Sequence, residues 1–242
     1  MKEIFTRIED EQEVHIEIET AAYAYSEKLA WLYSIFIKFD SLDETNDSFE
    51  EFLETKESII LALEHENRAK YVGMRIVDGW SELYFYAGDS KNLDPIVSKM
   101  LKGLGYTYET SVVKDTKWDF HYKNLLPTAR ELAHIQSQKI IFLLEEEGDD
   151  ISVAREVEHY VSFEMPTQKA RFMNTMSLEG FEFKDEVASE EFENGVALVK
   201  KHSVEETRVR ETVNELFDAL SEYKGFYEGW STLLVSEVEE DG

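Results

Sequence analysis

The sequence contains no cysteine, and this absence excludes several kinds of chemistry. Without thiols the chain forms no disulfide framework, no thiolate nucleophile and no sulfur-ligated metal site, and a reducing compartment is favoured. Long apolar runs are also missing, since no stretch approaches the roughly 20 apolar residues that a membrane span requires. Residues 1–5 lack the uninterrupted apolar region of an export signal. We therefore expect a cytoplasmic protein of bacterial type without a membrane partner.

Basic side chains are scarce relative to acidic ones. The 242 residues include 25 Lys and Arg but 52 Asp and Glu, which gives a formal net charge of −27. Proteins bind nucleic acid mainly through Lys and Arg that neutralise phosphates, so RNA would be repelled by this chain before local contacts form. We expect no direct nucleic-acid partner. The same field would steer basic protein segments toward the chain, or would simply keep it soluble.

Sequence signals for catalysis and for metal binding are few. The six histidines include neither an i, i+4 pair nor an HExxH motif. The acidic run 145–150 lacks the alternating oxygen ligands and the central glycine of an EF-hand loop. His159 alternates with apolar residues, as a packing histidine on a strand does. We predict a protein that is not an enzyme and has no catalytic residue, metal or cofactor.

Apolar periodicity in the first half predicts one set of helices and strands. The expected elements are a leading strand around 15–19, a buried strand at 31–39, a helix from about 48 to 66, strands around 72–76 and 83–85, a helix from 94 to about 103 and a strand at 106–113. From residue 31 the order is β-α-β-β-α-β, which is that of the ferredoxin-like unit.

The second half repeats this order after a leading helix. The expected elements are a helix at 129–147, a strand at 153–163, a helix from 166 that ends by 180, strands at 181–183 and 196–200, a helix that begins after a capping box of Ser203 and Glu206, and a strand at 227–235. We predict an α+β fold of two ferredoxin-like (βαββαβ) domains with antiparallel sheets. The first domain would span residues 1–128 and the second residues 129–242.

Four separated motifs follow one another in the second half. They are Glu-Glu-Glu-Gly-Asp-Asp at 145–150, Glu158-His159, Gly180-Phe181, and Tyr-Glu-Gly-Trp at 227–230. In this order they resemble the RraB family of regulators of ribonuclease E activity. That resemblance implies binding to the protein-binding scaffold region of ribonuclease E, inhibition of the nuclease and an influence on messenger RNA decay. The extra first domain and the shorter acidic tail depart from the stand-alone regulator.

The first half carries motifs of its own. They are Trp-Ser-Glu-Leu-Tyr-Phe-Tyr at 80–86 and Trp-Asp-Phe-His-Tyr at 118–122, which runs into Leu-Leu-Pro at 125–127. These motifs resemble a bacterial domain-of-unknown-function family, six-nine-five, which often precedes RraB-like domains.

Residues of the second domain form one candidate partner-binding surface. If this domain acts as RraB does, Glu145, Glu146, Asp149 and Asp150 would steer a basic segment toward it. Trp230 is predicted to pack against the preceding helix at Leu216 and Leu220, with an exposed binding anchor as the alternative.

Tyrosines of the first domain form the other candidate surface. Strict alternation places Tyr71, Tyr84 and Tyr86 on the sheet face that the helices do not cover. RNA-recognition domains stack bases on such a face, but the charge of this chain argues against that use. We expect this face to be buried against the other domain or a second subunit, with a groove for a partner protein as the alternative.

Together these patterns predict a noncatalytic, protein-binding regulator whose partner is ribonuclease E or a related nuclease. A small-ligand-binding or structural two-domain protein unrelated to ribonucleases is the alternative function, because similarity of fold does not prove a shared target. A homodimer is an alternative assembly. The sequence leaves open the identity of the target and the role of the first domain.

Overall fold

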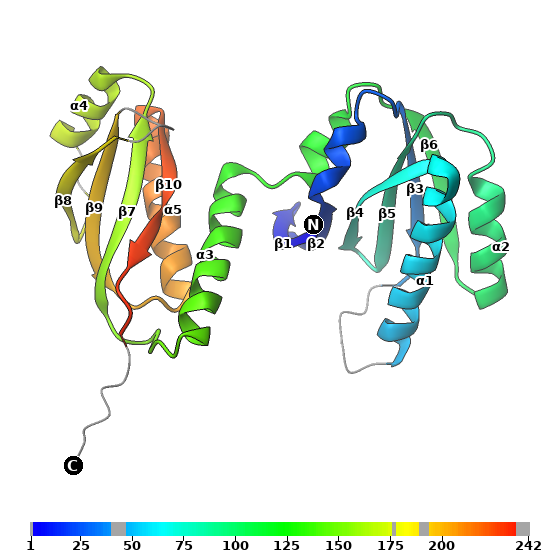
Figure 1. Cartoon of the computed structure of the whole chain (residues 1–242), viewed down its shortest axis with the longest axis horizontal. Helices are drawn as coiled ribbons and strands as arrows, with labels where there is room; N and C mark the ends of the chain where they lie inside the picture. The colour runs from blue at the N-terminus through cyan, green and yellow to red at the C-terminus, as the bar shows by residue number, and fades with distance from the viewer. Residues whose placement is uncertain (1, 40–46, 176–177, 189–193, 236–242) are drawn as a thin grey trace, which may run out of the picture. The chain divides into compact units, whose positions relative to one another are not determined.

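The computed structural model describes residues 2–39, 47–175, 178–188 and 194–235 (Figure 1). The acidic turn predicted before residue 48 lies largely outside these residues, as does the end of the acidic tail. The chain divides into two compact units, Met1–Leu126 (unit 1) and Pro127–Gly242 (unit 2). Each unit contains helices and one antiparallel sheet, which confirms the predicted α+β class. None of the described helices is both long and apolar enough to span a membrane.

Unit 1 contains a six-stranded sheet in the order β1-β2-β4-β5-β3-β6, with every neighbouring pair antiparallel. Its strands are β1 (Lys2–Glu9), β2 (Gln12–Glu19), β3 (Trp31–Ile37), β4 (Ala69–Val77), β5 (Trp80–Ala87) and β6 (Tyr108–Lys114). Helices α1 (Asp47–Glu64) and α2 (Asp94–Leu104) cover one face, and η1 (Thr20–Tyr25), η2 (His65–Asn67) and the π-helix η3 (His121–Leu125) complete the unit (Figure 1). The main core lies between this face and the two helices.

Strand β1 was not predicted from the sequence. It pairs with β2 over its whole length, and Asp10 and Glu11 join the two strands with φ values of 48° and 66°. Two consecutive residues with positive φ make the tight turn whose twist suits a β-hairpin, but Asp-Glu is a weak sequence signal for it. The hairpin adds β1 and β2 to the sheet beside β4.

Tyr84 and Tyr86 lie on the sheet face away from α1 and α2, as predicted, but their own unit buries them. The Trp118 ring stacks on Tyr86 with centroids 4.0 Å apart, and the Phe120 ring lies 4.5 Å from that of Tyr84. The Tyr86 hydroxyl also donates a hydrogen bond of 2.6 Å to Asp115. The expectation that the other domain or a second subunit buries these tyrosines is therefore wrong, because the chain after β6 returns across this face.

Tyr71 lies on the opposite face from the one predicted. The register between β4 and β5 shifts between Tyr71 and Gly73, so Tyr71 pairs with the core residue Phe85. A β-bulge inserts one extra residue and reverses the direction of the side chains beyond it. Tyr71 is consequently a core residue that is 2% exposed. Alternation alone cannot reveal this bulge.

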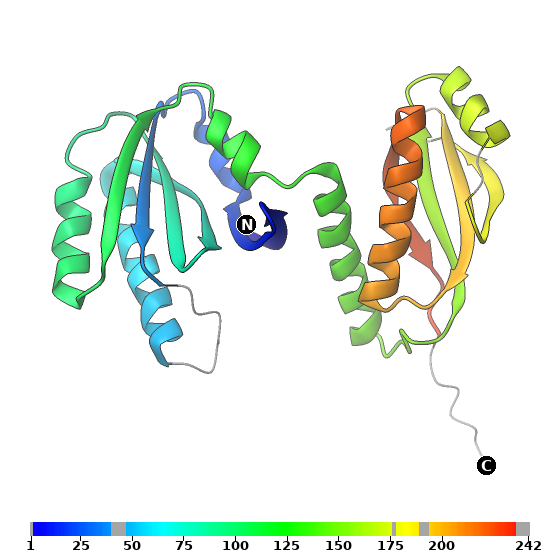
Figure 2. The ribbon, with the colours of Figure 1, turned by 180° about the vertical axis from the view of Figure 1, so that it is seen from behind.

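Unit 2 contains a four-stranded antiparallel sheet in the order β10-β7-β9-β8. Its strands are β7 (Arg155–Phe163), β8 (Phe181–Val187), β9 (Gly195–His202) and β10 (Gly225–Thr232), and its helices are α3 (Ala129–Glu146), α4 (Pro166–Thr175) and α5 (Glu206–Tyr223). Helix α3 runs beside α5, which both views show (Figures 1 and 2). Two hydrophobic clusters fill the unit, one around α4 and the second half of α5, the other around α3 and the first half of α5.

The two long helices of unit 2 begin in different ways. At α3, the Thr128 side chain accepts a hydrogen bond from the Glu131 N–H, and the Glu131 carboxylate accepts one from the Thr128 N–H. This capping box satisfies two backbone donors that have no partner inside the helix. The capping box predicted at Ser203 and Glu206 is wrong, because α5 begins after Glu205 and the Ser203 hydroxyl donates to the Glu205 side chain instead.

Candidate functional site

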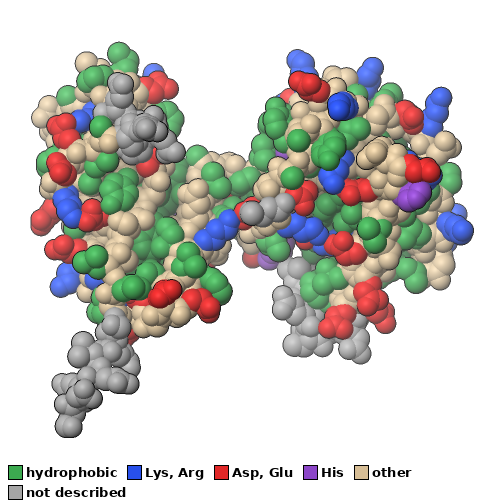
Figure 3. Space-filling model, in the orientation of Figure 1, with side chains coloured by type: hydrophobic (Ala, Val, Ile, Leu, Met, Phe, Trp, Pro, Cys, Tyr) green, Lys and Arg blue, Asp and Glu red, His purple; other side chains and the backbone are tan. Residues whose placement is uncertain are grey.

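The last turn of α3 combines exposed apolar and acidic side chains. Phe142 and Leu143 are 59% and 61% exposed, and Glu145 and Glu146 are exposed beside them. Residues three or four positions apart share one side of a helix, so Glu146 lies next to both Phe142 and Leu143. Figure 3 shows acidic and hydrophobic side chains together at the end of this helix. We call these four residues the α3 end surface.

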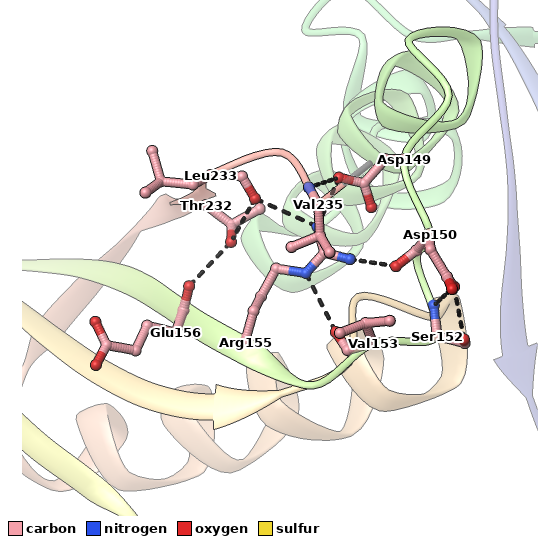
Figure 4. Close-up of polar contacts among 9 residues, drawn as sticks. All are labelled: Asp149, Asp150, Ser152, Val153, Arg155, Glu156, Thr232, Leu233 and Val235. Carbon is pink, nitrogen blue, oxygen red and sulfur yellow. Dashed lines mark hydrogen bonds and ion pairs between the residues drawn. The ribbon is translucent and has the colours of Figure 1, made fainter. Parts of the chain in front are cut away.

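Asp149 differs from the neighbouring glutamates because its side chain is fully buried. The Arg155 guanidinium donates to its carboxylate at 2.6 Å, and the Val235 N–H donates to the same oxygen at 2.8 Å (Figure 4). The hydrogen bond from Arg155 holds the pKa of Asp149 below its usual range. Asp149 therefore stabilises unit 2 from within, and the expectation that it acts as an exposed steering charge is wrong.

Arg155 extends this contact to three segments of the chain. Its other donors reach the carbonyl oxygens of Asp150, Val153 and, at 3.3 Å, Leu233 (Figure 4). A guanidinium presents five N–H donors in a planar fork, which suits it to joining several acceptors. Arg155 thus ties the loop after α3 and the beginning of β7 to the chain that follows β10.

Asp150 holds the same junction through its backbone. Its N–H donates to the Val235 carbonyl at 2.9 Å, and its carboxylate accepts from the N–H and the hydroxyl of Ser152. Its half-buried side chain is therefore engaged in a local turn. Leu233 and Leu234, which this junction holds beside the loop after α3, are 85% and 55% exposed.

Trp230 is 5% exposed and lies in the core of unit 2. Its indole N–H donates to the Ser137 hydroxyl at 2.9 Å, and its cluster contains residues of α3 and the first half of α5. Trp230 packs against the preceding helix as predicted, but at Val209 and Val213 rather than at Leu216 and Leu220, which belong to the other cluster. Burial by its own unit excludes Trp230 as an exposed anchor in this conformation.

Two buried histidines, His159 on β7 and His202 on β9, lie side by side in the sheet of unit 2. Both ring nitrogens of His159 have a polar partner: Nε2 lies 3.1 Å from His202 Nε2, and Nδ1 lies 3.0 Å from the Tyr227 hydroxyl. Burial lowers the pKa of both rings, which favours their neutral forms. His202 Nδ1 donates to the Ser203 carbonyl, so in the neutral pair His202 Nε2 accepts from His159 Nε2, and His159 Nδ1 accepts from the Tyr227 hydroxyl. The sequence indicated His159 as a packing residue but not its partner His202.

A metal site is not evident among the described residues, where no group of three or more His, Asp or Glu side chains is placed to hold an ion. The described part of unit 2 instead combines a buried polar framework with an exposed acidic and apolar helix end. These features are typical of a protein-binding domain, in which exposed apolar groups contribute affinity and charges guide association.

Comparison with protein families identifies both halves of the chain. Residues 4–126, slightly more than half of the chain, match the Family of unknown function (DUF695), and the chain belongs to this family. Residues 134–232 match the family Regulator of ribonuclease activity B (RraB). Both resemblances noted in the sequence are thus confirmed. No curated protein matches the chain.

Proposed function

We propose that this protein is a noncatalytic regulator that binds and inhibits a ribonuclease of the E type through unit 2. The observation that carries the proposal is the match of residues 134–232 to a family of ribonuclease regulators. A role in messenger RNA decay would place the protein in the cytoplasm. Unit 1 belongs to a family of unknown function, and the proposed contact does not involve it.

The α3 end surface is the proposed contact with the nuclease. Glu145 and Glu146 would attract a basic segment of the partner, and Phe142 and Leu143 would bury apolar area once it has bound. Exposed charge pairs contribute little to affinity, so the two apolar residues would supply most of it. Asp149 and Asp150 would support this surface from the junction behind it rather than contact the partner.

Strand order supports the finer prediction that each unit is ferredoxin-like. In unit 2 the elements follow the order β7-α4-β8-β9-α5-β10, and the fourth strand lies beside the first and the third beside the second. In unit 1 the strands β3, β4, β5 and β6 have the same relation, with the β1–β2 hairpin added beside β4. We infer the same fold in both units, with α3 as an addition to the second.

Association with purified ribonuclease E, measured by surface plasmon resonance at two ionic strengths, tests the proposal. A double variant, Glu145→Gln with Glu146→Gln, should lower the association rate at low salt and leave the melting temperature unchanged. Phe142→Ser should raise the dissociation rate, whereas Phe183→Ser serves as the matched control because Phe183 is 47% exposed on β8. Absence of binding by the parent protein would contradict the proposed function. Binding that none of these variants changes would place the contact on another surface.

A further inference from the structure

A cavity of about 520 Å³ opens in unit 1 where α1 leaves the β1–β2 end of the sheet uncovered. Its walls are mainly apolar and come from three strands and one helix; they include Ile4, Phe49, Leu53, Met74 and Ile76. Ile4 pairs with Glu17, and Glu17 pairs with Met74, so these strand residues share the sheet face that carries α1. Cavities of about 300–1,000 Å³ with apolar walls and a few polar groups are typical sites for small ligands.

Buried ionic groups form the polar part of this cavity. Lys56 and Glu17 both line it, and Lys56 Nζ lies 2.9 Å from a Glu17 carboxylate oxygen. The Tyr71 hydroxyl donates to the other oxygen of Glu17 at 2.9 Å, and Lys2 Nζ lies 3.4 Å from it. Glu17 is thus satisfied by three donors. Because Lys56 and Glu17 are 3% and 8% exposed, the pair is held away from bulk water.

Lys56 retains unused hydrogen-bonding capacity. An ammonium group carries three N–H donors, and Glu17 is the acceptor that the described residues provide for it. A buried donor without an acceptor costs free energy, so an oxygen atom inside the cavity would stabilise Lys56. The cavity therefore combines apolar walls with a donor that requires an acceptor.

The local charges indicate which acceptor fits. Lys2 and Lys56 are balanced by Glu17 and Glu57, which also pairs with Lys2 at 2.9 Å. A ligand carboxylate would bring an uncompensated negative charge into a chain whose net charge is already −27, whereas a carbonyl oxygen accepts the hydrogen bond without adding charge. We propose that this cavity binds a small, neutral, apolar molecule through a carbonyl oxygen that accepts a hydrogen bond from Lys56.

Nile red, a neutral aromatic dye with a carbonyl oxygen, tests the site in the full chain by its fluorescence. Ile4→Glu places a charge at the cavity, and Ile8→Glu is the matched control. Both residues lie on β1 and on the same sheet face, and they are 67% and 68% exposed. Of the two, only Ile4 lines the cavity. We expect the dye to bind the parent and Ile8→Glu with equal affinity and Ile4→Glu at least about tenfold more weakly. Leu53→Trp, which fills the cavity from α1, should also weaken binding. Equal affinity in all four proteins, or no binding to the parent, would overturn the site.

Competition between two molecules of similar shape tests the assigned hydrogen bond. Acetophenone has a carbonyl oxygen and ethylbenzene has none. If Lys56 donates to the ligand, acetophenone should displace the dye at a concentration at least about tenfold lower than ethylbenzene requires. Hydrogen bonds to charged groups are among the stronger ones. Equal competition by the two would overturn the role of Lys56. Melting temperatures of all variants verify that unit 1 remains folded.

Discussion

Trp230 is predicted to stabilise unit 2, because its ring fills the cluster between α3, α5 and β10 and its N–H reaches Ser137. Trp230→Ala should lower the free energy of unfolding of unit 2 by about 3–5 kcal/mol. Trp230→Phe should lower it less, since an apolar ring remains and only the hydrogen bond and part of the packing are lost. Urea denaturation followed by circular dichroism measures both. A urea midpoint of unit 2 in Trp230→Ala equal to that of the parent protein would contradict this role.

His159 is predicted to make unit 2 sensitive to acid. Burial, with a further contribution from His202, lowers its pKa from 6.5 to about 3 in the folded protein. Between these values the unfolded chain binds a proton that the folded chain does not, so stability is full above about pH 6.5 and falls as the pH drops toward 3. This group alone should cost about 2 kcal/mol at pH 5 relative to pH 7.5.

The variant His159→Gln removes this titrating group and keeps the other histidines of unit 2. Burial also lowers the pKa values of His202 and His134, so these two residues contribute pH dependence of their own. The difference in unfolding free energy between pH 7.5 and pH 5 should therefore shrink, but not vanish, in His159→Gln. Urea titrations of parent and variant at both pH values measure it, and an identical pH dependence in the two proteins would refute the prediction.

Among the elements, the contact between β2 and β4 depends on a glycine. A Cβ atom at Gly73 would lie 2.5 Å from the backbone oxygen of Glu17, which cannot move without separating the two strands. Gly73→Ala should therefore destabilise unit 1 by about 1–3 kcal/mol. Gly103→Ala is the control: it lies in α2 with no atom within 4 Å of its added Cβ, and should be stabilising by about 0.5–1 kcal/mol. Urea denaturation compares them, and similar effects of the two changes would exclude the steric explanation.

The elements also show where sequence patterns suffice and where they fail. Helices α2 and α3 lie close to their predicted bounds because Pro95 and Thr128 mark their first turns, and Gly105 and Gly148 follow their ends. Local chemistry determines such boundaries. The bulge beside Tyr71 and the packing of Trp118 on Tyr86 were not predictable, since each depends on segments that are distant in the sequence.

At the scale of the whole molecule, the charge of −27 predicts that the protein does not bind RNA. Stacking of a base on an aromatic side chain contributes about 1–3 kcal/mol, but the tyrosines considered for this role are buried, and phosphate repulsion opposes any approach. We expect no measurable binding of single-stranded RNA at physiological salt in a fluorescence anisotropy titration. Submicromolar binding that weakens as salt rises would contradict this prediction.

The sequence by itself determined the net charge, the absence of thiol chemistry, the α+β class and the two family resemblances, because composition and local motifs carry this information. The tertiary structure alone decided which candidate site residues are accessible. Glu145 and Asp149 belong to one acidic run, yet Glu145 is exposed and Asp149 is enclosed by Arg155 and Val235. Burial depends on which distant segments pack around a side chain, and a pattern of neighbouring residues does not record that packing.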